Sequence, residues 1–435
     1  MSKKIITLMI MLGVMFLGLN PVHSATTQEL ERQISELSGK VEKMRSRARR
    51  SGGSSGGSTS KTTVLGYGEM HGSISEGHNK LDQHRFVIGV QSQLSNWISF
   101  SAEIDYEHAG QLLEFEFGFL DFSLSPEFNI RTGSVLIPVG FLNEFHEPNR
   151  FLTTERPDLH KYVIPTSWSG GGAGVFGSLS NGLTYRVYLV NSVQSVKSAG
   201  ASAGDGNGNG GSALQFKDTS GIRSGRGELN KRTWNNVALT GRVEKMIVPG
   251  LNVGASFYGG NTAHGQLRDN RKGFMFLSEA DVQYRKGAFE MNSSIANISI
   301  EDTAELNQYA ANERTQSGAI GKRIFGWNIQ AGVHLLQLAG KSTKHDLIAH
   351  AMYESIDTQA DLDDSCQATT VGGGKARDCA VDHKAARDIV HFGLTYKPIP
   401  AVALKLDHKI IQYAYDASNG GDRQGSTHLG MAYMY

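Results

Sequence analysis

The chain has 435 residues, with 52 Gly, only 9 Pro, 39% hydrophobic residues and a mean hydropathy of −0.30. Its 43 basic and 42 acidic residues leave a net charge of +1, which argues against nucleic acid as a partner. Beyond residue 19, no stretch approaches the roughly 18 consecutive apolar residues that a membrane-spanning helix needs. If the chain enters a membrane, it therefore does so as strands.

The amino-terminal segment has the pattern of a secretory signal peptide. Lys3 and Lys4 precede a mostly apolar run over residues 5–19, and small or permissive residues lead to a cleavage site near Ala25. We therefore expect residues 1–24 to be removed and the mature protein to be exported.

Residues 25–50 are expected to form a short periplasmic coiled-coil helix. Apolar residues recur there at spacings of four and three, at Leu30, Ile34, Leu37, Val41 and Met44. The seam covers only about two to three heptads, so a single amphipathic helix lying on a surface is the alternative. Glycine and serine then dominate residues 51–60, which predicts a flexible linker before the next domain.

From residue 61 to 435, segments of alternating polarity predict an all-β fold: a transmembrane antiparallel β-barrel of about 16 strands. In residues 98–107, for example, apolar side chains at even positions alternate with polar ones at odd positions. Turn-forming residues place seven short turns, at 95–96, 126–127, 181–182, 249–250, 286–287, 340–343 and 398–400. Eight longer or tip-like connections fall roughly at 74–83, 109–111, 141–170, 193–233, 260–273, 301–325, 357–386 and 414–423.

Seven turns and eight loops join sixteen strands, and an even number returns both chain ends to the periplasmic side. The stretches 193–233 and 301–325 are long enough to hide a further strand pair. The last residues place Leu429, Met431, Tyr433 and Tyr435 on one face, which is typical of the closing strand of an outer-membrane barrel. Taken alone, this ending also fits an edge strand of a soluble sheet.

The alternation predicts which charged side chains line the lumen. The pore-lining candidates are acidic on two neighbouring strands and basic on others: Glu103, Asp105, Glu107, Glu114, Glu116, Arg131, Arg186, Arg242 and Arg285. Opposed charges across a narrow lumen create a transverse field that orients polar solutes. The alternative is that these charges solvate a wide lumen or pair with one another.

The connection 141–170 is the candidate constriction loop. It spans about thirty residues without a periodic pattern, and such loops are usually functional or disordered. Its mixed charges are suited to holding a loop against a wall, with Glu144, Arg150, Arg156 and Lys161 as the candidate residues.

Cys366 and Cys379 are the two cysteines of the chain, and both lie in one polar stretch between strand patterns. A loop disulfide is the expected state in an oxidising compartment. A pair of free thiols or half of a metal site is the alternative, although no zinc-type spacing supports a metal.

The stretch 138–150, continuing through Glu155-Arg156-Pro157 and 164–168, resembles the phosphate-selective porin O and P family. The resemblance implies a trimeric, sixteen-stranded porin with a long loop folded into a pore rich in arginine and lysine. We transfer the pore-folded loop to 141–170 and no individual phosphate-binding residue.

The charge of the barrel departs from that pattern. Taking Lys3, Lys4 and the seven basic and four acidic residues of 25–60 from the totals of 43 and 42 leaves 34 basic residues against 38 acidic. This balance argues against strong anion selectivity.

The sequence therefore predicts a porin in the outer membrane of a Gram-negative-type bacterium, admitting small hydrophilic solutes and ions, with anions such as phosphate as candidates. The expected partners are the lipid bilayer, lipopolysaccharide and two further copies of the chain; no metal or cofactor is needed. The alternative is a structural or surface-interaction barrel, an adhesin or receptor, with a closed lumen. An enzyme is disfavoured, because no GxSxG or HExxH pattern stands in a supporting context.

Overall fold

The structure is a computed structural model. It describes residues 61–196, 214–226, 229, 234–313, 318–341, 343–363, 370–371, 374–375, 381–416 and 420–435. The predicted signal peptide (1–24), coiled coil (25–50), linker (51–60) and both cysteines, Cys366 and Cys379, lie outside the described residues. Among the described helices, none is long and apolar enough to cross a membrane.

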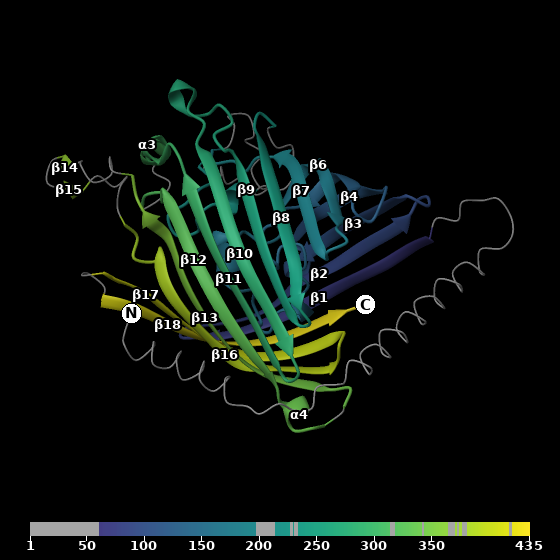
Figure 1. The fold of residues 1–435 in the computed structure, drawn as a ribbon. Coiled ribbons are helices and arrows are strands. Elements are labelled where there is room, and N and C mark those ends of the chain that lie inside the picture. Colours follow the sequence, from purple (N-terminus) through teal and green to yellow (C-terminus); the bar gives the residue numbers. More distant parts are fainter. Residues whose placement is uncertain are drawn as a thin grey trace. The chain divides into compact units, whose positions relative to one another are not determined.

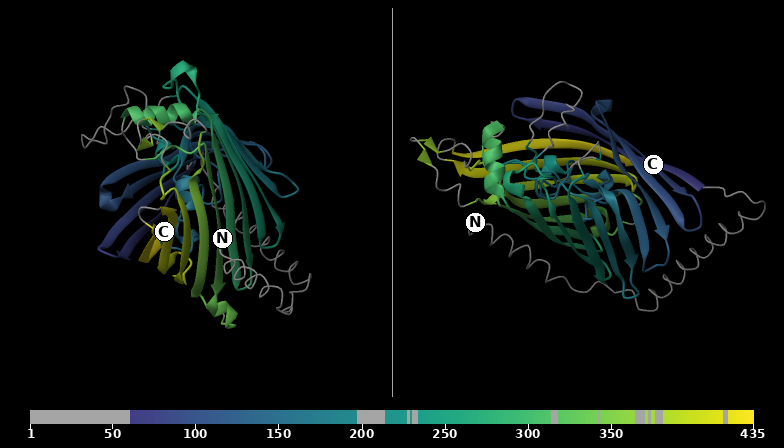
Figure 2. Two further views of the ribbon diagram at one scale, coloured as in Figure 1. Left: turned by 90° about the vertical axis from the view of Figure 1, so that its left-hand side faces the viewer. Right: turned by 90° about the horizontal axis from the view of Figure 1, so that it is seen from above.

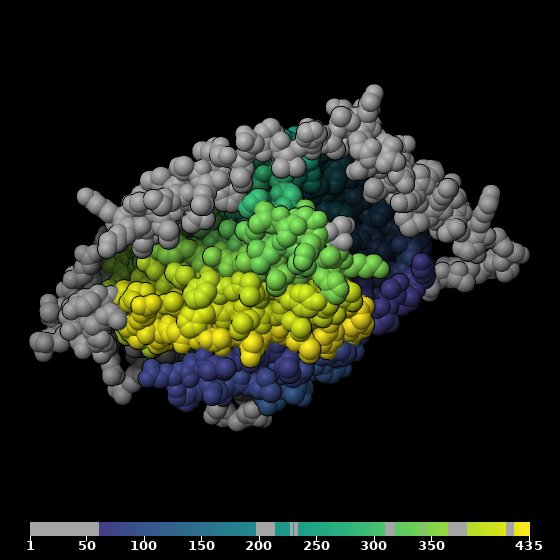
Figure 3. All heavy atoms as spheres, turned by 90° about the horizontal axis from the view of Figure 1, so that it is seen from below, coloured from purple at the N-terminus to yellow at the C-terminus, as the bar shows by residue number. Residues whose placement is uncertain are grey.

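Sixteen antiparallel strands close into a barrel (Figure 1), which confirms the predicted fold class. Each strand pairs with its neighbours in sequence, and β1 pairs with β18 to close the ring. Figure 3 shows the yellow carboxyl-terminal strands beside the purple amino-terminal ones. The strands are β1 (Lys61–Ser75), β2 (His78–Gln93), β3 (Ile98–Glu107), β4 (Leu112–Ser123), β5 (Asn129–Leu136), β6 (Ser169–Ser178), β7 (Leu183–Asn191), β8 (Val237–Val248), β9 (Leu251–Asn261), β10 (Phe274–Lys286), β11 (Phe289–Ile300), β12 (Arg323–His334), β13 (Asp346–Asp361), β16 (Ala386–Ile399), β17 (Val402–Asp416) and β18 (Gly420–Met434).

Short elements fill the connections. The helical ones are η1 (His108–Gly110), η2 (Pro148–Arg150), η3 (Leu159–Val163), η4 (Arg223–Gly225), η5 (Arg268–Asn270), α3 (Thr303–Glu313) and α4 (Leu335–Leu338). A two-residue hairpin, β14 (Thr370–Val371) with β15 (Gly374–Lys375), lies in the connection before β16. The stretch 301–325, where a strand pair could have been hidden, holds α3 instead.

Three predicted connections differ in extent. The one expected at 414–423 is reduced to residues 417–419, since β17 ends at Asp416 and β18 begins at Gly420. The longer or tip-like connection expected at 74–83 is a two-residue tip, because β1 and β2 pair as far as Ser75 and His78 and only Glu76 and Gly77 join them. The sequence there is polar because the strand ends carry polar side chains, not because the strands have stopped. The expected loop 141–170 is in fact 137–168, since β6 begins at Ser169.

The strand faces follow the alternation in the sequence. On β4 and β17, the large apolar side chains Leu113, Phe115, Leu404 and Leu406 are between 45% and 66% exposed on the outer face. An outer face of this kind suits contact with lipid hydrocarbon. The inner face carries charged residues and a buried apolar cluster, whose strand members run from Val135 of β5 to Ile389 of β16 and which includes residues of the loops.

Candidate functional site

The connection from β5 to β6, residues 137–168, folds into the barrel; we call it the lumen loop. Seen from above in Figure 2, the connections of this region lie within the ring of strands. Its ends meet at a neck, where the Ile137 amide donates to the Trp168 carbonyl at 2.9 Å. The buried side-chain amide of Asn143 also donates to the Ile137 carbonyl at 2.7 Å and to the Trp168 carbonyl at 2.9 Å. The neck is therefore fixed by the loop's own residues.

One side of the lumen loop is bound to the wall formed by β1 to β4. The His146 Nε2 atom lies 2.7 Å from Glu116 Oε1 and 3.1 Å from the Tyr67 hydroxyl. The buried guanidinium of Arg85 donates to the His146 carbonyl at 3.2 Å and pairs with Glu69 at 2.6 Å. The register between β3 and β4 shifts beside Glu116, and this β-bulge turns Glu116 toward the loop.

The other side of the lumen loop is bound to β13 and β17. The buried carboxylate of Glu354 accepts the backbone amides of Asp158 and Leu159, both at 2.9 Å. The Lys409 ammonium lies 2.6 Å from Asp158 Oδ1. The Lys405 ammonium, also buried, donates to the Pro148, Phe151 and Thr153 carbonyls at 2.6, 2.9 and 2.9 Å. Contacts on both walls mean that the loop crosses the lumen.

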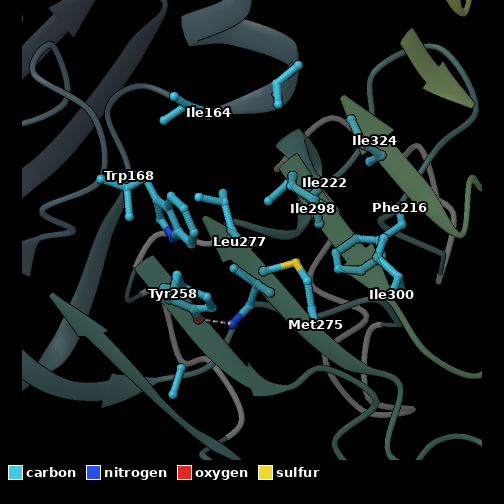
Figure 4. Packing of buried hydrophobic residues seen from close by; sticks show 14 of the residues in the cluster. Ile164, Trp168, Phe216, Ile222, Tyr258, Met275, Leu277, Ile298, Ile300 and Ile324 are labelled. Carbon is cyan, nitrogen blue, oxygen red and sulfur yellow. Dashed lines mark hydrogen bonds between the residues drawn. The ribbon is translucent and has the colours of Figure 1, made fainter. Parts of the chain in front are cut away.

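Apolar packing supports the same placement. Trp168 stacks obliquely on Tyr258, with ring centroids 4.6 Å apart, in the buried cluster of Figure 4. On β12, a Cβ atom at Gly326 would lie 2.8 Å from the Leu159 side chain, so the strand needs glycine there for the loop to approach. Within the loop, Gly140 adopts a φ of 69°, a conformation that glycine tolerates without steric cost.

The connection from β7 to β8 covers part of the lumen loop. Its Phe216 and Ile222 are buried in the apolar cluster. The Arg226 guanidinium donates to the Thr166 carbonyl at 2.7 Å, and the Arg223 guanidinium donates to the Lys161 carbonyl at 3.4 Å. The two loops therefore form one packed layer inside the barrel.

A cavity of about 100 Å³ remains between these loops and β1–β2. It is lined by Glu69, His71, His84, Phe151, Glu155, Arg156, Lys161, Thr166 and Arg223. Since a cavity needs about 10–15 Å³ of such space to hold one water, this cavity would hold several waters or one small ion. A second cavity, of about 10 Å³, lies beside Arg150 and the polar side chains of β11 and β12.

The larger cavity carries three cationic side chains, Arg156, Lys161 and Arg223, and two carboxylates. Burial, and then the positive charge of Arg85, lowers the pKa of Arg156 to about 10. Burial and the neighbouring Arg226 lower the pKa of Arg223 to about 10. Both guanidinium groups therefore remain charged at neutral pH, and the cavity keeps a concentration of positive charge.

The four arginines predicted to line the pore lie on inward-facing strand positions, and each has an acidic partner. Arg131 binds Asp121 through two nitrogens, and Arg242 binds Asp281 likewise. Arg186 bridges Glu144 of the lumen loop and Glu244 of β8, at 3.1 and 2.8 Å. Arg285 is exposed and 3.9 Å from Glu290. The structure brings these groups into pairs, and their effect on permeation stays a prediction.

The five predicted acidic residues share the inner face of β3 and β4. Asp105 lies 3.7 Å from Arg85, and Glu116 binds His146. Glu103 lies beside Glu116 and His146, with ligand atoms within 4.8 Å of one another. Glu107 and Glu114 follow toward the loop end of the strands, where β3 and β4 remain paired.

The four predicted constriction residues separate into different surroundings. Glu144 binds Arg186, while Arg150 is half-exposed and pairs with Glu147 at 2.8 Å. Arg156 and Lys161 line the larger cavity.

Sequence reasoning missed several residues that hold the lumen loop, above all Lys405, Asp407 and Lys409 on β17. A signal was present: these charges alternate with Leu404 and Leu406, which face outward. Period-2 alternation alone would have assigned them to the lumen. The sequence could not identify the groups that Lys405 and Lys409 bind, because these groups lie about 250 residues earlier in the chain.

Replacing Lys405→Met should loosen the segment 148–154 of the lumen loop. The change removes three hydrogen bonds from an ammonium group, and bonds to charged groups contribute about 1.5–3 kcal/mol each. We expect hydrogen exchange of the backbone amides in 148–154 to accelerate by tenfold or more. Lys397→Met, which removes a single bond to the Asn149 carbonyl, is the matched control and should have a smaller effect. Equal exchange in both variants would contradict the anchoring role of Lys405.

Several solved structures of outer membrane proteins have a similar fold. The chain is similar to the outer membrane channel DcaP of Acinetobacter baumannii, with 9% identity, 88% of this chain and 99% of that chain covered, and a TM-score of 0.53. It is also similar to OmpF of Salmonella typhi, with 11% identity, coverage of 86% and 98%, and a TM-score of 0.50. The trimer form of OmpT, an outer membrane protein of Vibrio cholerae, has 8% identity, coverage of 86% and 99%, and a TM-score of 0.50.

At these identities the likeness concerns the fold. In sequence, the chain is similar to an uncharacterized protein of Aquifex aeolicus (strain VF5), with 28% identity over 358 residues. The aligned region covers 80% of this chain and 74% of that protein. No family model matches the chain.

Proposed function

We propose that the protein is an outer-membrane porin through which small hydrophilic solutes and ions diffuse passively. The observation that carries this proposal is the lumen loop, which crosses the barrel and leaves a charged cavity of about 100 Å³. A narrow, water-accessible passage lined by fixed charges selects solutes by size and charge. The similar folds of DcaP, described as an outer membrane channel, and of OmpF support the same assignment.

Small anions, with phosphate as one candidate, are the solutes that the cavity favours. Arg156, Lys161 and Arg223 outnumber the carboxylates of Glu69 and Glu155 along its lining. Guanidinium groups bind oxyanions through paired hydrogen bonds. The barrel as a whole has 34 basic and 38 acidic residues, so the preference would arise locally at the cavity rather than from net charge.

The proposed location is the outer membrane of a Gram-negative-type bacterium, with lipid and lipopolysaccharide around the barrel and a homotrimer as the assembly. The signal-peptide pattern of residues 1–24 and the apolar outer face of the strands support export and membrane insertion. The trimer form recorded for OmpT of Vibrio cholerae supports the assembly by analogy of fold.

Conductance recording tests the proposal. The purified mature protein is inserted into a planar lipid bilayer, and current is measured under a salt gradient before and after phosphate is added. Stepwise channels are expected, and a current that falls as phosphate rises would support a phosphate-binding passage. Channels indifferent to phosphate would leave a general porin. Silence from a demonstrably folded barrel would overturn the channel proposal.

A structural or surface-interaction role with a closed lumen is the second candidate. It is favoured by one specific observation: the lumen loop is bonded to both walls, and buried charges such as Arg85 and Glu69 are paired. A barrel closed in this way would present its loops as an adhesin or receptor. Absence of conductance, together with retained folding, is the outcome that this role requires.

Removing residues 25–60 should weaken the trimer if that segment forms the predicted coiled coil. The physical reason is that a coiled coil adds a buried apolar seam to the contacts between barrels. The measurement is the temperature at which the trimer dissociates in native gels, compared between the truncated and mature proteins. An equally heat-resistant trimer would limit the segment to a spacer role.

A further inference from the structure

We infer that Asp82, His84 and His108 form a binding site for a divalent transition-metal ion on the inner wall of the barrel. The three ligand atoms lie within 4.8 Å of one another. Asp82 Oδ2 is 3.2 Å from His84 Nδ1 and 2.8 Å from His108 Nδ1. Two imidazoles and a carboxylate converging on one point are the ligand types that zinc, copper and nickel ions prefer.

The fold brings these residues together from separate elements. Asp82 and His84 come from β2, near its turn with β1, and His108 comes from η1, immediately after β3. Both positions lie at the end of the barrel that carries the long loops. Because β2 and η1 are fixed by the barrel's hydrogen bonds, the three ligands are arranged in advance of any ion.

The spacing of the ligand atoms suits a small ion. Zinc binds imidazole nitrogen and carboxylate oxygen at about 2.0–2.2 Å, which places neighbouring ligands of a tetrahedral site about 3.3 Å apart. The separations of 3.2 and 2.8 Å lie near this value, and the separation between the two imidazole nitrogens is at most 4.8 Å. Without an ion, Asp82 Oδ2 forms hydrogen bonds with His84 Nδ1 and His108 Nδ1, and a bound metal would replace the protons of these bonds.

The three side chains are partly exposed, and neighbouring side chains hold the ring of His84 in place. The side chains of Asp82, His84 and His108 are 33%, 33% and 40% exposed, so an ion could enter from the lumen and keep water ligands. The ring of His71 stacks on that of His84 at 4.4 Å, and Glu69 binds His71 Nε2 at 3.0 Å. Packing of this kind restrains the orientation of a metal-binding imidazole.

A second group, Glu103, Glu116 and His146, has similar spacing but lies largely buried between the lumen loop and the wall. The side chains of His146 and Glu116 are only 4% and 5% exposed, so an ion would have no open route to them. We therefore expect an added ion to bind at the exposed site of Asp82, His84 and His108.

Cobalt and zinc titration of the full mature protein in detergent tests the inference. We expect one Co²⁺ per chain with visible ligand-field absorption, displaced by Zn²⁺. The double variant His84→Ala with His108→Ala should bind at least tenfold more weakly, because it removes two of three ligands. His345→Ala, at an exposed histidine that stacks on Tyr396, is the control and should bind as the parent does.

Asp82→Asn, a change of similar volume, gives a second variant if the double one fails to fold, and it should also weaken binding. Failure of the parent protein to bind cobalt or zinc would overturn the inference, as would equal binding by a folded double variant or by folded Asp82→Asn. Binding is measured without a membrane potential, so its outcome is independent of whether the protein conducts. A bound metal in a silent barrel would reject the porin proposal and leave the metal site standing.

Discussion

Replacing residues 138–167 by two glycines should raise the single-channel conductance several-fold. The loop ends at Ile137 and Trp168 are already joined by a backbone hydrogen bond, so a two-residue turn can close the gap. The removed segment crosses the lumen and is bonded to opposite walls at Glu116 and Glu354. Without it, Arg85 and Lys405 would face water in a wider passage. Planar-bilayer recording at fixed salt measures the change.

Folding of the shortened barrel must be shown separately, because the deletion exposes part of the apolar cluster around Tyr258. Retained β-structure by circular dichroism and retained heat-modifiable migration in gels would establish it. A cut that removes α4 from the β12–β13 turn, at the opposite end of the barrel, is the control and should leave conductance unchanged. If the loop-deleted barrel folds and its conductance matches the parent, the lumen loop does not constrict the pore.

Replacing Arg156→Glu should shift the ion selectivity strongly toward cations. Arg156 lines the cavity with Lys161 and Arg223, and its pKa of about 10 keeps it charged at neutral pH. The substitution changes the charge of the cavity lining by two units, and charges beside the low-dielectric protein interior interact more strongly than in bulk water. We expect the cation-to-anion permeability ratio to rise by about tenfold, a change of about 1.4 kcal/mol in relative barrier. The reversal potential under a salt gradient measures it.

Arg150→Glu provides a matched control for this experiment. It makes the same change of charge in the same loop, but the Arg150 side chain is 52% exposed and pairs with Glu147 outside the larger cavity. Its effect on reversal potential should be much smaller, because solvent screens an exposed charge. Similar shifts in the two variants would show that net loop charge, rather than the cavity, sets selectivity. Arg156→Gln should give an intermediate shift.

The sequence by itself determined the architecture of the barrel. Alternation with a period of two is a local property, so residues such as Ile104 and Asp105 could be assigned to opposite faces before any partner was known. Turn chemistry is local as well, and Asn181-Gly182 and Pro249-Gly250 do separate consecutive strands. The sixteen-strand fold follows from these two signals together.

Local signals were weakest where the strands end and where loops pack. The polar residues at 74–83 suggested a longer or tip-like connection over the whole range, yet β1 and β2 continue to Ser75 and His78 because backbone pairing does not depend on side-chain polarity. The inward turn of 137–168 was expected from a family resemblance rather than from the residues. The β-bulge that points Glu116 at His146 leaves no recognisable mark in the sequence.

The partners across the lumen were decided by tertiary structure alone. The alternation of polar and apolar residues places Lys405 on the inner face of β17. The three carbonyls that accept its hydrogen bonds, however, belong to a loop about 250 residues earlier in the chain. Asp82 and His108 likewise meet only because β2 and β3 pair in one particular register. Alternation fixes the side of a strand from which a residue points, whereas the closure and register of the whole barrel fix what that residue meets.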